Sequence, residues 1–199
     1  SALAAMEEEL QEFRQADGTT TRKALLLNMG PRTSERGGYA EEQAEKFTVR
    51  QVGQPKDGKV QMQVSAFNLV QNYVVDEGTV VVADGGDGSD TVLEYPMPAV
   101  TTTSDNEPQM LGPGDDGYVA PTFSLGSVVR GGEADDTIET SNGDDDVWGD
   151  GGKDAIRTGL GNGVVRGGSD KDTIDGGQGD DRVFGDDVDD RVNGGAGAD

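Results

Sequence analysis

The chain has 199 residues, with 39 Asp and Glu against 16 Lys and Arg, which gives a formal net charge of −23 at pH 7. This excess of carboxylates argues against a nucleic-acid partner, which needs stripes of Lys and Arg, and favours cations as partners. A charged fraction of 28% and a mean hydropathy of −0.61 exclude a membrane span. Because only 32% of the residues are hydrophobic and 32 are glycine, a conventional packed core over the whole length is not expected.

The chain contains neither cysteine nor histidine. Without cysteine there is no disulfide and no zinc–thiolate site, and without histidine the Ser-His-Asp, Cys-His and His-Glu-x-x-His hydrolases are excluded. No paired acids of the kind that a glycosidase uses stand out. We therefore expect that the chain is not an enzyme.

The opening segment, residues 1–18, predicts a short amphipathic helix. Leu3, Met6, Leu10 and Phe13 follow one another at spacings of three and four, and Gly18 is a stop signal. We expect this helix to close the end of the neighbouring β-structure rather than to bind a separate partner.

From Phe47 the hydrophobic period changes to two, which is typical of strands. The runs "FTVRQV" and "KVQMQV", separated by "GQPKDG", predict a hairpin, and further strands are predicted in "NLVQNYVV", "TVVVA" and "TVLEY". Residues 1–95 are thus expected to form an N-terminal region of one helix and short strands. Residues 96–121 hold five of the seven prolines and are expected to be a loop or insertion, and residues 122–199 to form a third region.

A nine-residue repeat runs without a gap from Gly131 to the last residue, through seven full units such as "GGQGDDRVF". Position eight of every full unit is Ile or Val. Position six is Asp in every unit except "TGLGNGVVR", which has glycine: the residues are Asp136, Asp145, Asp154, Gly163, Asp172, Asp181, Asp190 and, in the final partial unit, Asp199. Seven units in register are a strong signal of a repeat architecture.

These units resemble the hemolysin-type calcium-binding nonapeptides of the RTX family, whose pattern is G-G-x-G-x-D-x-U-x. The matching unit "GGDGSDTVL" at 85–93 adds Asp90, and the looser "LGPGDDGYV" at 111–119 adds Asp116. The resemblance implies an all-β fold dominated by a right-handed parallel β-roll with two nonapeptides per turn. It also implies that several calcium ions are held between consecutive loops by the position-six carboxylates and by glycine-loop carbonyls.

With 18 residues per turn, two columns of metal ligands are implied. Asp136, Asp154, Asp172 and Asp190 would line a first edge, and Asp145, Gly163, Asp181 and Asp199 a second edge, which should bind calcium more weakly near residue 163. One inward aliphatic per nine residues is too little burial to offset the conformational entropy of ordering them, and stacked carboxylates repel one another. The tract should therefore be disordered without a cation, and calcium fits better than magnesium because it accepts six to eight oxygens in flexible geometry.

Position nine carries a second regularity on the outer faces. One column holds Glu139, Arg157, Asp175 and Asn193, and the other alternates guanidinium groups with aromatic rings, through Arg130, Trp148, Arg166 and Phe184. We expect the second column to form cation–π pairs that stiffen the sheet or offer a contact surface, the alternative being chance occupancy of exposed positions.

The resemblance implies a calcium-dependent structural or adhesive module of a secreted or cell-surface protein, such as an adhesin, an S-layer-like protein or a filament subunit. Export by type I secretion and an extracellular location follow from the same resemblance. The partners expected are calcium and other copies of the chain or cell-surface components, with no nucleic acid. The alternative is the C-terminal calcium-folding part of a secreted RTX enzyme or toxin.

Overall fold

The computed structural model describes residues 4–7, 23–27, 44–97, 100–102, 108–110 and 123–199, and all regular structure in these ranges is β-strand. The expected N-terminal helix is wrong where it can be compared, because β1 (Ala4–Glu7) is a strand paired antiparallel with β2 (Ala24–Leu27). Residues 8–18 of that expectation lie outside the described ranges. Pairing with a fully buried strand gives β1 backbone hydrogen bonds on one side, and this tertiary contact overrides the local helical periodicity.

Two sheets and one small hairpin account for all the described strands. The strands of the first half are β3 (Lys46–Lys56), β4 (Lys59–Ala66), β5 (Leu69–Asp76), β6 (Val80–Asp84), β7 (Thr91–Met97), β8 (Val100–Thr102) and β9 (Pro108–Met110). The strands of the repeats are β10 (Ser127–Gly132), β11 (Thr137–Glu139), β12 (Asp146–Gly151), β13 (Ala155–Arg157), β14 (Val164–Ser169), β15 (Thr173–Asp175), β16 (Arg182–Asp186) and β17 (Arg191–Asn193). One sheet has the order β1-β2-β6-β10-β12-β14-β16, the other β17-β15-β13-β11-β7-β3-β4-β5.

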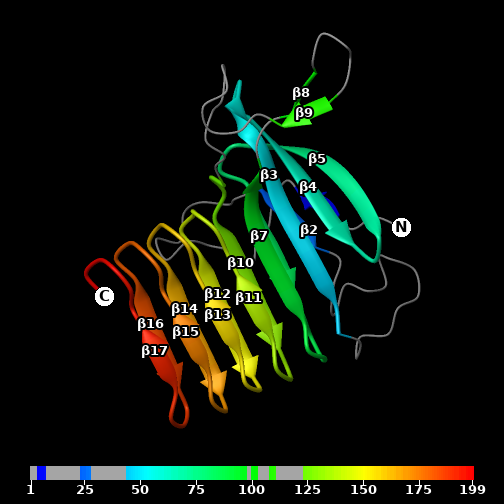
Figure 1. Cartoon of the computed structure of the whole chain (residues 1–199). Helices are drawn as coiled ribbons and strands as arrows, with labels where there is room; N and C mark the ends of the chain where they lie inside the picture. Colours follow the sequence, from blue (N-terminus) through cyan, green and yellow to red (C-terminus); the bar gives the residue numbers. More distant parts are fainter. Residues whose placement is uncertain (1–3, 8–22, 28–43, 98–99, 103–107, 111–122) are drawn as a thin grey trace.

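The repeats alternate between the two sheets, so that strands 18 residues apart are parallel neighbours (Figure 1). Val147 pairs with Val165 in one sheet and Ile156 with Ile174 in the other, and all four side chains are buried. The period-nine aliphatic column of the sequence is thus the core between the sheets from Ile138 to Ile174, whereas Val183 is partly buried and Val192 is exposed. The stacking of residues 18 apart is confirmed.

Strands from before the repeats continue both sheets in the same parallel sense. Strand β6 pairs with β10 and β2 with β6, while β7 pairs with β11 and β3 with β7. The buried apolar column therefore extends backwards, through Ala83 next to Val129 in one sheet, and through Val92 next to Ile138 and Phe47 next to Val92 in the other. The proposed division at residues 95 and 121 remains a prediction, but residues 80–97 share both sheets with the repeats.

Antiparallel strands widen the second sheet at its N-terminal end. The predicted hairpin is confirmed as β3–β4, with Val49 opposite Val64 and with Asp57 and Gly58 at the turn, both at positive φ as such two-residue turns require. The bulkiest buried side chains gather at this end, among them Phe47, Leu25, Met62 and Phe123. Within the proline-rich segment, β8 and β9 form a two-stranded antiparallel sheet, and its residues 98–99, 103–107 and 111–121 lie outside the described ranges.

Candidate metal centre

The position-six aspartates of the first edge lie at the ends of the loops that join the two sheets. Asp136, Asp154 and Asp172 close the loops 133–136, 152–154 and 170–172, and each is 2% exposed. The backbone N–H of each aspartate donates to the Oδ1 atom of the next one along the column, at 2.8 Å from Asp136 to Asp154 and again from Asp154 to Asp172. One carboxylate oxygen per turn is therefore used in a hydrogen-bonded ladder.

The second carboxylate oxygen, Oδ2, lacks a partner in these three aspartates and in Asp181 of the second edge. The Oδ2 atoms of Asp136, Asp154, Asp172 and Asp181 are buried and accept no hydrogen bond from the protein. On β12, a Cβ added to Gly149 would lie 2.2 Å from Oδ2 of Asp154, so glycine at position one leaves the space that this oxygen occupies. A buried anionic oxygen without a partner is costly unless a cation or a proton neutralises it.

Burial raises the pKa values of these four aspartates. Desolvation is the largest cause, and proximity to neighbouring aspartates adds to it, so that the pKa of Asp136 and that of Asp154 rise to about 7. The pKa values of Asp172 and Asp181 are raised for the same reasons. A cation bound at these oxygens would favour the charged form and reverse the shift.

The second edge is less regular, because Gly163 has no side chain. Asp181 accepts the N–H of Gly163 at 2.7 Å, but the corresponding bond from Asp145 to residue 163 cannot form. Asp145 itself is fully hydrogen-bonded: Oδ1 accepts the N–H of Ser127 at 2.9 Å and Oδ2 accepts the hydroxyl of Thr140 at 2.7 Å. Burial still raises the pKa of Asp145 to about 7.

The remaining predicted ligands differ in their surroundings. Asp190 is half-buried and Asp199 is exposed, and each accepts the backbone N–H of the preceding aspartate in its column at 3.0 Å. Asp90 is buried, accepts the N–H of Glu45 at 2.7 Å and donates its own N–H to Asp136 at 2.7 Å, so that it continues the first-edge column. Asp116 lies outside the described residues.

A second ladder, at position five, was missed by the sequence reasoning. Along the second edge, the N–H of Asn162 donates to Oδ1 of Asp144 at 2.9 Å, and that of Asp180 to Oδ1 of Asn162 at 2.9 Å. Ala198 completes the column by donating to Asp180 at 3.0 Å. The signal was the Asp or Asn at a spacing of 18, and the unit that lacks a position-six carboxylate keeps its place in this ladder through the neutral Asn162.

The donor set decides what kind of ion could be held. Among the residues that the structure describes, no group of three or more acidic side chains comes together as a complete ligand set. A metal ion would therefore need main-chain carbonyls of the glycine loops in addition to the Oδ2 atoms. An all-oxygen site that mixes carboxylate and carbonyl ligands suits calcium. The buried, unpartnered oxygens of Asp136, Asp154, Asp172 and Asp181 thus fit this ion and would hold it.

The predicted outer columns form as registered rows. Trp148 pairs with Arg130 on one side and with Arg166 on the other, and Arg166 pairs with Phe184. The guanidinium of Arg166 lies 4.3 Å from the centre of the Phe184 ring, which is a cation–π contact. The predicted cation–π contact is thus present for this pair.

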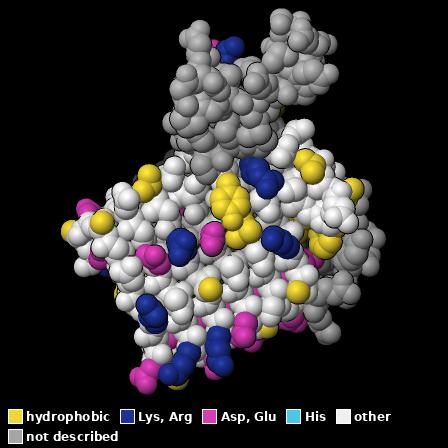
Figure 2. All heavy atoms as spheres, in the orientation of Figure 1, with side chains coloured by type: hydrophobic (Ala, Val, Ile, Leu, Met, Phe, Trp, Pro, Cys, Tyr) yellow, Lys and Arg dark blue, Asp and Glu magenta, His cyan; other side chains and the backbone are white. Residues whose placement is uncertain are grey.

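Ion pairs and polar contacts hold the neighbouring outer side chains. Arg130 donates to both carboxylate oxygens of Asp150, at 2.8 and 2.9 Å. In the other column, Arg157 lies 3.8 Å from Asp175, which also accepts a bond from Asn193. Figure 2 shows acidic and basic side chains interspersed on one face of the molecule.

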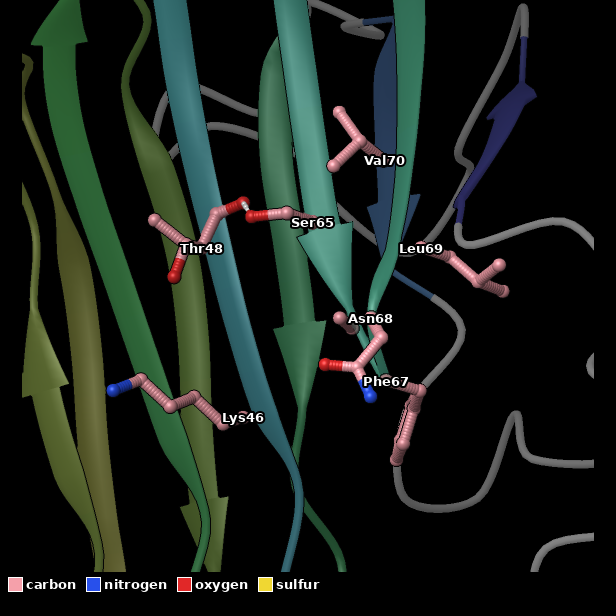
Figure 3. Close-up of a pocket in the computed structure, with 8 residues that line it drawn as sticks. Lys46, Thr48, Ser65, Phe67, Asn68, Leu69 and Val70 are labelled. Carbon is pink, nitrogen blue, oxygen red and sulfur yellow. Dashed lines mark hydrogen bonds between the residues drawn. The ribbon is translucent and has the colours of Figure 1, made fainter.

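A surface hollow of about 410 Å³ lies away from the aspartate columns, on β3, β4, β5 and the turn between the last two (Figure 3). Its wall includes the side chains of Thr48, Ser65, Asn68 and Leu69, and its one charged lining residue is Lys46. With no carboxylate in its lining, this hollow offers no site for a divalent cation.

Strands β10 to β17 form a parallel β-solenoid of 18-residue turns with aspartate columns inside its loops, the architecture of a repeat protein that binds cations between its turns. The RTX calcium-binding nonapeptide repeat family matches residues 130–165 and 166–199. Residues 130–199 are therefore RTX calcium-binding repeats. Comparisons with curated proteins and with solved structures found no significant match. The described residues include no helix that is long and apolar enough to cross a membrane.

Proposed function

We propose that this chain is a calcium-folded structural module of a secreted or cell-surface RTX protein, with a mechanical or adhesive rather than a catalytic role. The observation that carries the proposal is the buried Oδ2 atom without a partner at Asp136, Asp154, Asp172 and Asp181. Calcium between the loops would neutralise these oxygens. The same ions would offset the entropy of ordering turns whose core is a single aliphatic residue per nonapeptide.

The location follows from the affinity expected of such sites. Extracellular calcium modules bind at about 10⁻⁴ to 10⁻³ M, so that a roll of this kind stays unfolded in the cytosol and folds outside the cell. RTX proteins are typically secreted, which supports the same location. The roll is proposed to be right-handed, as connections between parallel strands of one sheet nearly always are.

Support for a structural role comes from the outer faces of the repeats. Their position-nine side chains form registered rows, and the contacts of Arg166 with Phe184 and of Arg130 with Asp150 tie successive turns together. Such rows stiffen a rod whose ends can be joined to other parts of a larger protein. Adhesion or assembly into filaments would use these exposed rows as contact surfaces.

Far-UV circular dichroism of the chain, titrated with calcium and separately with magnesium, tests the proposal. Calcium is expected to induce β-structure with a midpoint of about 10⁻⁴ to 10⁻³ M, and magnesium to have little effect because it dehydrates reluctantly. Asp154→Asn should shift the calcium midpoint upwards. Asp175→Asn is the matched control, because this position-nine carboxylate faces outwards and pairs with Arg157. Full β-structure of the repeats in chelator at neutral pH would refute calcium-driven folding.

A further inference from the structure

A buried polar cluster joins the repeats to the preceding strands at the second edge. Glu94 of β7 is 2% exposed, and its carboxylate accepts the hydroxyl of Ser127 at 2.8 Å and a bond from the main chain of Ser141. Ser127 in turn donates its N–H to Asp145, whose second oxygen accepts the hydroxyl of Thr140. Four side chains, two of them acidic, thus satisfy one another out of contact with water.

The same column position is built differently one and two turns later. Thr158, which occupies the position of Thr140 in the next second-edge loop, donates its hydroxyl to the carbonyl of Gly176 instead of to a carboxylate. Gly163 follows in place of an aspartate. In the turn after that, Oδ2 of Asp181 is buried with no partner. Asp145 therefore has both oxygens occupied by protein donors, whereas Asp181 has one available for a cation.

The segment that contributes Ser127 is also anchored to the N-terminal strands without using any acidic residue. The backbone N–H and the hydroxyl of Ser124 donate to the side-chain oxygen of buried Gln51, at 2.7 and 3.1 Å. Phe123 and Leu125 on either side of it are buried in the hydrophobic core. Burial of this size holds the junction in place by itself, unlike the single aliphatic residue of each later unit.

We propose that Asp145 is a hydrogen-bonding residue and not a calcium ligand, and that the cluster of Glu94, Ser127, Thr140 and Asp145 clamps the repeats to β7 without a cation. On the second edge, calcium binding then begins only beyond Gly163, at Asp181. This inference rests on the proposed function for the other sites. The clamp provides a cation-independent surface on which the calcium-requiring turns can stack.

Calcium stoichiometry of the full chain at neutral pH separates the two roles. In isothermal titration calorimetry, Asp145→Asn is expected to bind as many calcium ions as the wild type, because the amide oxygen still accepts the Ser127 N–H. Asp181→Asn, the matched variant in the same column, is expected to lose one ion or to bind it at least ten-fold more weakly. Loss of an ion in Asp145→Asn to the same extent as in Asp181→Asn would overturn the proposal. A wild-type chain that binds no calcium would instead refute the proposed function.

Hydrogen exchange in chelator tests the clamp directly. Peptides that cover Ser127 and the end of β7 are expected to stay protected without calcium, whereas peptides that cover residues 164–199 exchange rapidly. Thr140→Val should abolish the protection at Ser127, and Thr158→Val, the same change one turn later, should leave it unchanged. Glu94→Gln keeps a hydrogen-bonding side chain and should preserve the protection. Equal, rapid exchange at Ser127 and in residues 164–199 of the wild type in chelator would overturn the clamp while leaving calcium-driven folding intact.

Discussion

Restoring the missing carboxylate with Gly163→Asp is expected to stabilise the calcium-bound roll. The backbone at residue 163 is not in the left-handed region, and a Cβ there would lie 3.2 Å from Oδ1 of Asp181, a tight contact that a shift of a few tenths of an ångström relieves. The new Oδ1 would accept the N–H of Asp145, as the other position-six aspartates do along their columns. One such bond contributes about 1 kcal/mol. This corresponds to a rise in Tm of about 2–4 °C for a chain of this size.

The sign of the effect should depend on calcium. With the ion present, the second oxygen of the introduced carboxylate adds a ligand next to Asp181, and the gain exceeds that of the hydrogen bond alone. In chelator at neutral pH, the same carboxylate is buried beside other carboxylates, and the variant should be less stable than the wild type. Gly163→Asn separates the two contributions, because its amide oxygen accepts the bond without a charge, and it should raise stability modestly in both conditions.

Thermal unfolding followed by circular dichroism, in millimolar calcium and in chelator, measures these shifts. A lower Tm of Gly163→Asp in calcium, with Gly163→Asn unaffected, would show that the second edge gains nothing from a carboxylate at this position. A rise of equal size in both conditions would show that the new side chain acts through its hydrogen bond alone. Either result would refute the reasoning that a carboxylate at residue 163 extends the calcium ligands that begin at Asp181.

Three further predictions concern the columns. Gly149→Ala should destabilise the roll by about 1–3 kcal/mol, because the added methyl group overpacks against Oδ2 of Asp154. Gly163→Ala is the control and should be tolerated. A small loss of Tm that is equal in the two variants would contradict this prediction. Because the folded-state pKa of Asp136 and of Asp154 is about 7 against 3.8 unfolded, their stabilising effect in chelator is complete below pH 3.8 and is lost as the pH rises to about 7. Lowering the pH from 8 to 5 should thus promote β-structure without calcium, and a circular dichroism signal that does not change, or that falls, would exclude this. Asn162→Ala should cost about 1 kcal/mol by removing the acceptor for the N–H of Asp180, and an unchanged urea midpoint would show that the position-five ladder carries no stability.

The periodicity of the repeats allowed the main features of the roll to be predicted from the sequence. The unbroken Ile and Val at position eight predicted the inward aliphatic column, and the resemblance to RTX nonapeptides, with two units per turn, implied that aspartates 18 residues apart stack. Both followed because each nonapeptide repeats the same local solution, so that the partner of a residue such as Asp136 is found at a fixed distance along the chain. The position-five ladder through Asn162 was available from the same spacing but was overlooked.

The N-terminal helix was mispredicted where it can be compared because residues 4–7, although part of a segment with a helical period, have a strand partner elsewhere in the chain. The sequence around Ala4–Glu7 does not indicate that this segment will pair with the buried strand β2. The continuation of both sheets through β6 and β7 likewise depends on pairings that cross the proline-rich segment. Such long-range contacts outweigh local propensity once a buried partner is in place.

For this protein, the nine-residue period, the inward aliphatic column and the oxygen ligands that suit a hard cation followed from residue types at fixed spacing in the sequence. The roll of 18-residue turns was implied by the resemblance to RTX nonapeptides. Only the tertiary structure decided which carboxylate oxygens accept hydrogen bonds and which remain without a partner. Asp145 and Asp181 occupy the same position of their repeats, yet Thr140 satisfies the one and the other is left buried and unpartnered. That difference arises from side chains that meet only when the turns stack. It distinguishes the carboxylate oxygen that is proposed to bind calcium from the one that the protein already satisfies.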